Sequence, residues 1–274
     1  MQRSKLIHIA LAAAVVVAPL ASWAPAARAQ GVPVAASVPA EDALAAFRAA
    51  LRAELPAAEA AAPDQAAALL GAARAALDQA GETVAREQIV LVVDRNPAVQ
   101  RLALVLARPG TAWEVLALEK VSTGQAGRRG YFVTPVGVFP HSTAIRDYRA
   151  EGTYNENGIR GLGAKGSRVW DFGWNQAQPG WLPASEPPRE MRLLLHATDP
   201  DQLEQRLGRT ASMGCIRISA ALNRFLDRRG VLDVDHEASL LTGDQRHRAV
   251  LHPEREPTAL AGRLLVVLDS SGPF

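Results

Sequence analysis

The sequence predicts a mainly β fold of the α+β class, preceded by a small helical extension. From Glu87 onward, runs of Val, Leu and Ile recur at strand length, whereas apolar residues before this point repeat at helical spacing. A third observation points to a site. A short apolar run ends on His196, and the only cysteine of the chain, Cys215, follows nineteen residues later.

Residues 1–29 have the pattern of a signal peptide. Arg3 and Lys5 form a basic start, residues 6–20 are apolar, and Ala27-Arg28-Ala29 is a small-x-small cleavage site. The apolar run is too short to span a membrane, so we expect an exported, periplasmic protein without a transmembrane segment after cleavage. An uncleaved amphipathic anchor is the alternative.

The leader holds three of the thirty basic residues and none of the twenty-eight acidic ones, so the rest of the chain is close to neutral. No basic block remains that would indicate a nucleic-acid partner.

Residues 30–86 are expected to form an Ala-rich linker and a helical hairpin. Leu44, Phe47 and Leu51 fall at helical spacing in the first helix, which ends at Pro56. The second helix is predicted over 63–80, with Gly81 as its stop. We expect these helices to pack on the following domain or to space it from the leader.

The domain from residue 87 to 274 begins with three predicted strands, 88–94, 101–107 and 112–121, which form an antiparallel meander. One more strand is predicted over 263–269. Between Pro140 and Pro188 the chain is polar and glycine-rich, with six aromatic residues and little periodicity. We expect this long segment to cover the active site, or else its aromatic side chains to fill the edge of the fold.

His196 and Cys215 have the residue types of a nucleophile and its base. The thiolate is the reactive form of cysteine, and an imidazole within hydrogen-bond reach can take the thiol proton and later protonate a leaving amine. A short helix starting at Pro200 and ending at Gly208 would turn the chain back, and another helix would begin near Ser219. The alternative for Cys215 is a small buried apolar residue.

The turn before the cysteine offers further groups. We expect the consecutive backbone N–H groups of Met213, Gly214 and Cys215 to point at one spot and form an oxyanion hole. Arg217 is expected either to fix the turn or to bind a substrate carboxylate. The remaining histidines show no metal-ligand spacing, so neither a metal nor another cofactor is expected.

The stretch from His196 to Arg217 resembles the L,D-transpeptidase catalytic domain, the YkuD-like family that remodels bacterial peptidoglycan. His196, Ser212, Gly214, Cys215 and Arg217 match its His…Ser-His-Gly-Cys pattern, but Met213 replaces the usual second histidine. The segments Ser122-Thr123-Gly124 and Thr134 to Phe139 also match and are expected to be scaffold. The resemblance implies a β-sandwich with short helices flanking the active site.

The resemblance also implies a reaction. Cys215 would form a thioester at the L-centre of diaminopimelate in a tetrapeptide stem and pass the acyl group to an amine, on another stem or on an outer-membrane lipoprotein. Ser212, Met213, Gly214 and Arg217 would bind the substrate and its oxyanion, and carbapenems would acylate the cysteine. The alternatives are a carboxypeptidase or amidase that uses water, and a cell-wall-binding protein whose site has decayed.

Overall fold

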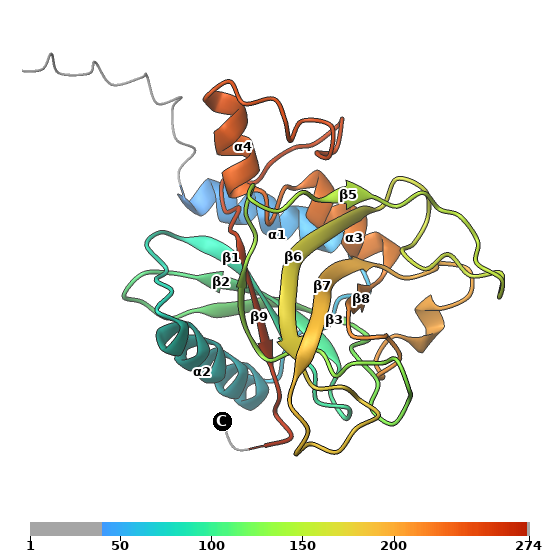
Figure 1. Ribbon diagram of the computed structural model, residues 1–274. Helices are drawn as coiled ribbons and strands as arrows, with labels where there is room; N and C mark the ends of the chain where they lie inside the picture. The colour runs from blue at the N-terminus through green and yellow to red at the C-terminus, as the bar shows by residue number, and fades with distance from the viewer. Residues whose placement is uncertain (1–39, 273–274) are drawn as a thin grey trace, which may run out of the picture. The chain divides into compact units, whose positions relative to one another are not determined.

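The computed structural model describes residues 40–272, so the predicted signal peptide and most of the linker lie outside the described residues. Two sheets and four α-helices make up this part of the chain (Figure 1). The helices are α1 (Ala40–Glu54), α2 (Pro63–Ala80), α3 (Ala220–Arg228) and α4 (Val234–Leu241), with a 3₁₀ turn η1 (Glu204–Arg206). The strands are β1 (Gln88–Asp94), β2 (Arg101–Ala107), β3 (Glu114–Lys120), β4 (Gly137–Pro140), β5 (Tyr148–Arg149), β6 (Arg168–Ala177), β7 (Arg189–Ala197), β8 (Ile216–Ile218) and β9 (Leu264–Leu268). None of the helices in this part is long and apolar enough to cross a membrane.

The first sheet has the strand order β3-β2-β1-β9-β4. Strands β1, β2 and β3 form the predicted antiparallel meander. The predicted strand near the end of the chain is β9, and it lies between β1 and β4, parallel to β1. β1 and β9 are buried along their whole length, which explains why their sequences are continuous apolar runs.

The second sheet has the order β5-β6-β7-β8 and faces the first sheet across one apolar core. Leu91 and Leu104 contribute to this core from the first sheet, and Trp170 and Leu195 from the second. The two sheets therefore form the predicted β-sandwich (Figure 1).

The two N-terminal helices pack on different parts of the domain. α1 contributes Phe47 to the core between the sheets, where its ring meets Phe225 of α3 edge-on at 5.5 Å between ring centroids. α2 covers the outer face of the first sheet with Leu69 and Leu77. Its predicted end is confirmed, since Gly81 caps it in the left-handed conformation. Both helices thus belong to the same compact unit as the sheets.

The helix predicted after Pro200 was wrong. The helix expected from Pro200 to Gly208 is only the 3₁₀ turn η1. Asp199 does accept the N–H groups of Asp201 and Gln202, but it also accepts the N–H of Arg160, so it anchors a neighbouring segment as well as capping a turn.

The long segment between Pro140 and Pro188, for which no strand was predicted, contains β5 and the ten-residue β6. Trp170 and Phe172 of β6 lie in the core, whereas Tyr154 and Trp174 are exposed. The edge-filling alternative therefore holds for the first two aromatic residues.

Candidate active site

The predicted nucleophile lies directly before β8, at the outer face of the second sheet. In the parallel pairing of β7 with β8, Leu195 lies opposite Ile216, and His196 lies opposite Arg217. Leu195 and Ile216 are fully buried in the core between the sheets. Because side chains alternate along a strand, His196, Arg217 and Cys215 share the opposite face. The fold thus brings His196 and Cys215 to one face of two adjacent strands.

The Cys215 thiol is half-buried and contacts the backbone of β7. Its Sγ donates a hydrogen bond to the carbonyl oxygen of Arg192 at 3.8 Å. Burial raises the pKa of the thiol, while the N–H of Leu194 and the charge of Arg217 partly oppose this effect. The resting cysteine is therefore a protonated thiol at neutral pH and needs a base before it can attack.

His196 is buried, and its ring is held by the following residue. Nδ1 lies 2.8 Å from the carbonyl oxygen of Ala197. A carbonyl can only accept, so Nδ1 carries the proton and Nε2 presents its lone pair. Burial lowers the pKa of His196 to about 4, and the charge of Arg217 acts in the same direction. At neutral pH the imidazole is thus neutral, in the tautomer whose Nε2 can accept a proton.

The turn before Cys215 is fixed by two buried hydroxyl groups. Ser212 Oγ donates to the carbonyl of Cys215 at 2.5 Å and accepts the N–H of Gly214 at 3.1 Å. Thr134 Oγ1 donates to the carbonyl of Gly214 at 2.7 Å and accepts the N–H of Gly124 at 2.8 Å. These bonds join the turn to the two segments that the sequence predicted to be scaffold.

Met213 and Arg217 play different structural parts. The Met213 side chain is 55% exposed, and the residue is held through its carbonyl, which accepts the N–H of Phe132 at 3.1 Å. Arg217 is half-buried, and its NH1 donates to the carbonyl of Ala211 at 3.3 Å. This contact corresponds to the first of the two roles expected for Arg217, fixing the turn.

Sequence reasoning missed two polar residues near the thiol, Asp171 and Arg192, and considered a third, Tyr148, only as one of the six aromatic residues of the covering segment. The Arg192 guanidinium forms an ion pair with the buried Asp171 at 2.5 Å. Burial and then the Asp171 charge raise the pKa of Tyr148, and Arg192 and Cys215 also act on it. Arg192 could have been found by its even spacing from His196 along one strand. Asp171 could not, because β6 was not predicted.

A cavity of about 500 Å³ lies beside this face of the sheet, lined by Tyr148 to Asn155 and by Gly161 to Gly163. Two of its lining residues, Ala150 and Leu162, also belong to the small apolar cluster that Cys215 packs against. Part of the predicted covering segment therefore lies next to the thiol and borders a space large enough for a ligand.

The structure brings together histidines that the sequence gave no reason to group. His141 stacks on His236 with ring centroids 4.7 Å apart, and Asp233 lies close enough for the three to offer ligand atoms to one ion. However, both ring nitrogens of His141 face acceptors, the Leu232 carbonyl at 2.8 Å and the Asp147 carboxylate at 2.9 Å.

Both nitrogens of His141 therefore carry protons, and its pKa is raised; burial opposes this rise, and Asp147 drives it. The buried Arg168 guanidinium also pairs with Asp147 and Asp233. A metal ion at this position would face two cations, the protonated His141 and Arg168. The cluster is thus better suited to a buried ion-pair network than to a metal site.

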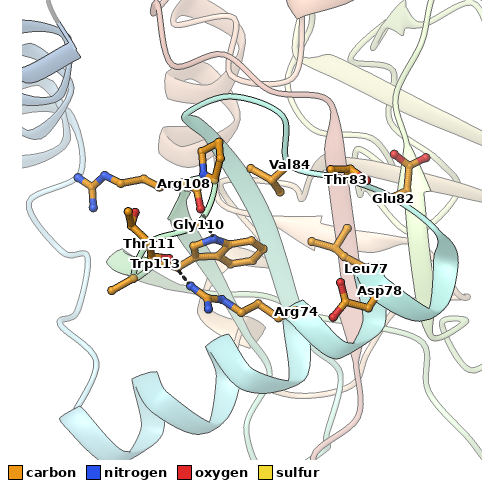
Figure 2. A pocket seen from close by; sticks show the side chains of 12 residues that line it. Arg74, Leu77, Asp78, Glu82, Thr83, Val84, Arg108, Gly110, Thr111 and Trp113 are labelled. Carbon is orange, nitrogen blue, oxygen red and sulfur yellow. Dashed lines mark hydrogen bonds between the residues drawn. The ribbon is translucent and has the colours of Figure 1, made fainter.

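A second cavity, of about 520 Å³, lies between α2 and the turn that joins β2 to β3 (Figure 2). Arg74 of α2 stacks over the Trp113 ring at 4.8 Å and donates to the carbonyl of Thr111 at 2.7 Å. This cavity borders the outer face of the other sheet and contains neither Cys215 nor His196. The candidate active site is therefore the outer face of the second sheet, where Cys215 and His196 lie, and not this cavity.

The chain matches one family model and resembles a solved structure. The chain resembles the crystal structure of the L,D-transpeptidase (residues 123–326) from Xylanimonas cellulosilytica, with 16% identity over 71% of this chain and 68% of that one, and a TM-score of 0.29. No curated protein matches the chain. The model of the L,D-transpeptidase catalytic domain, YkuD, matches residues 88–235, more than half of the sequence. With Cys215 and His196 inside the matched range, the chain belongs to the L,D-transpeptidase catalytic domain family.

Proposed function

We propose that the protein is a peptidoglycan L,D-transpeptidase that uses Cys215 as its nucleophile and His196 as its base. In the first half-reaction, the thiol turns from the Arg192 carbonyl toward Nε2 of His196, which takes its proton. Sγ attacks the carbonyl at the L-centre of diaminopimelate in a tetrapeptide stem. The bond to D-Ala then breaks, and the imidazolium protonates the leaving amine, which yields a thioester and free D-Ala.

In the second half-reaction, an amine attacks the thioester and gives its proton to His196. The new amide bond forms, and the thiol regains its proton. The acceptor amine belongs to another stem peptide, which gives a 3-3 cross-link, or to an outer-membrane lipoprotein. Water in place of the amine would make the same site a carboxypeptidase or an amidase.

The negative charge of the tetrahedral intermediate needs donors near Cys215. The N–H of Gly214 is engaged by Ser212 Oγ in the resting structure. Of the three N–H groups considered from the sequence, those of Met213 and Cys215 are therefore the candidates for the oxyanion hole. The exposed Met213 side chain has no required part in this proposal, so its replacement of the usual histidine is compatible with activity.

The observation that carries the proposal is the hydrogen bond from His196 Nδ1 to the Ala197 carbonyl. It orients the base and leaves Nε2 free on the same sheet face as the only cysteine, which supports a nucleophile and its base on that face. With the predicted leader, we also propose that the reaction takes place in the periplasm.

The test is incubation of residues 30–274 with a disaccharide-tetrapeptide, followed by mass spectrometry of the products. We expect free D-Ala and a 3-3 cross-linked dimer, and neither product with the Cys215→Ser variant. Release of D-Ala with only a tripeptide product would favour water as the acceptor. If wild type and Cys215→Ser both leave the substrate intact, also with a lipoprotein-derived lysine peptide as acceptor, the proposal is wrong.

A further inference from the structure

Arg192 is an exposed cation attached to the strand that carries the base. Its carbonyl oxygen accepts the hydrogen bond of the Cys215 thiol at 3.8 Å, so the residue lies directly beside the nucleophile. Its side chain is 48% exposed and lies on the outer face of the sheet, as His196 does. The charge of Arg192 is thus available to a molecule that approaches the thiol.

A buried carboxylate holds this cation in place. Asp171 is fully buried on β6, and its Oδ2 lies 2.5 Å from NH2 of Arg192. Asp171 Oδ1 accepts the N–H of Gly173 at 2.8 Å, so the carboxylate itself is fixed by the bulge of β6. A guanidinium has five N–H donors, and the ion pair with Asp171 involves only NH2 of Arg192. The exposed edge remains for a second carboxylate.

The other arginine near the thiol is less suited to this role. Arg217 is half-buried, its NH1 is bonded to the Ala211 carbonyl, and its Nε is buried. Burial lowers its pKa, so its charge is less well solvated than that of an exposed arginine. Arg192 differs, because Asp171 is the only side-chain partner that the described part of the chain provides for it.

We infer that Arg192 is a specificity-determining residue that binds a carboxylate of the acyl donor, with Asp171 as its positioning residue. This inference rests on the proposed function and names the substrate chemistry of that site. A stem peptide carries two candidate groups, the carboxylate of the terminal D-Ala and the side-chain carboxylate of diaminopimelate. The exposed Trp174, which is paired with Arg192 across β6 and β7, provides an apolar wall for the chain that bears it.

The first experiment does not depend on transpeptidase activity. Alkylation of Cys215 is measured with iodoacetate, which is anionic, and with iodoacetamide, which is neutral and of similar size. The quantity compared is the iodoacetate rate divided by the iodoacetamide rate. We expect a high ratio for wild type and a ratio about tenfold lower for Arg192→Gln, because a charge-assisted contact with the anionic reagent is lost. Arg192→Lys should keep part of the ratio, because it keeps the charge but not the planar fork.

The matched control is Arg189→Gln, an exposed arginine on the same strand. An unchanged ratio in this variant is expected. An equal fall in Arg189→Gln, or an unchanged ratio in Arg192→Gln, would overturn the assignment of Arg192. The iodoacetamide rate alone reports whether the thiol environment is intact in each variant.

The second experiment identifies the carboxylate. D-Ala or D-alaninamide release is followed with the free tetrapeptide, with a C-terminal amide and with diaminopimelate amidated on its side chain. Arg192→Gln should raise KM about 10- to 100-fold for the free peptide, with little change in kcat. For one of the two amidated peptides, Arg192→Gln should no longer raise KM. The carboxylate that is amidated in that peptide is the one that Arg192 binds. An effect of the same size on all three peptides would contradict carboxylate binding. If wild type shows no turnover, the proposed function fails, while the alkylation ratio still decides the role of Arg192.

Discussion

His196 donates its Nδ1–H to the carbonyl oxygen of Ala197, the next residue along β7, at 2.8 Å. This bond determines which nitrogen of the ring is basic. Burial lowers the pKa of His196 to about 4 and raises the pKa of the Cys215 thiol, so both shifts favour a neutral thiol and a neutral imidazole over a preformed ion pair.

The pH dependence of acylation follows from this neutral pair. The rate should be nearly constant from pH 7.5 down to pH 5.5, because His196 stays neutral until its pKa of about 4 is approached. A base with the ordinary histidine pKa of about 6.5 would instead lose about tenfold by pH 5.5. Stopped-flow acylation across this range distinguishes the two. His196→Ala should reduce the rate by about 10² to 10⁴ at every pH, and His252→Ala, the control, should not.

We expect part of the pH dependence of the unfolding free energy to come from His236 and to disappear when this residue is replaced. It is fully buried, neither ring nitrogen has a hydrogen-bond partner among the described residues, and the Asp233 carboxylate lies 4.0 Å from Nδ1. Burial lowers its pKa to about 4, below the ordinary value of about 6.5. Between these two values the unfolded state binds more protons, so stability is complete above pH 6.5 and is lost as pH falls toward 4.

His236→Phe should therefore lose less stability than wild type between pH 7 and pH 4, by up to about 3 kcal/mol. Urea unfolding at several pH values measures the difference. Both proteins keep His196, whose lowered pKa acts in the same direction, and His141, whose raised pKa acts in the opposite one. The contributions of these two residues therefore largely cancel when the wild-type and His236→Phe curves are subtracted. Parallel stability curves for the two proteins would show that His236 does not have the lowered pKa.

Gly214 should be irreplaceable in the turn before the nucleophile. Its φ is +134°, and an added Cβ would lie 2.8 Å from Sδ of Met191. Gly214→Ala should cost about 1–3 kcal/mol of unfolding free energy and most of the acylation rate. Gly161→Ala is the matched control, because its Cβ would meet nothing within 4 Å. Thermal unfolding and acylation assays of both variants should separate them, and similar behaviour would count against the strained turn.

Met213 tests whether the departure from the family pattern matters. Its side chain is exposed, and its carbonyl accepts the N–H of Phe132, so the backbone of the turn is fixed without the thioether. Met213→His should change the acylation rate by less than about tenfold, equivalent to roughly 1.4 kcal/mol. A large gain from a near-zero rate would instead identify Met213 as a lesion and the parent protein as a decayed enzyme.

The sequence predicted the elements whose patterns are local. The bounds of β1, β2 and α2 agree with the predicted ranges, because continuous apolar runs and a Pro start with a Gly stop are recorded in neighbouring residues. β6 was missed for a physical reason. The bulge between Asp171 and Trp174, with Gly173 at a φ of +77°, breaks the two-residue alternation on which the prediction depends.

The site divides in the same way. Cys215 and His196 could be named as candidate catalytic residues because their residue types and spacing are visible in one stretch of sequence. The ion pair of Arg192 with Asp171, and the bonds from Thr134 to the turn, join residues about twenty to eighty positions apart. Such pairings depend on strand register and packing, which a single sequence does not display.

The nucleophile is tested most directly by intact mass spectrometry after incubation with a carbapenem, the acylating inhibitor class that the family resemblance implies. Wild type should gain the mass of one drug-derived acyl group, and Cys215→Ser should gain none, because the hydroxyl is far less ionised than the thiol. His196→Ala should acquire the same adduct much more slowly. An adduct of equal extent on wild type and Cys215→Ser, or no adduct on wild type, would contradict the assignment of Cys215.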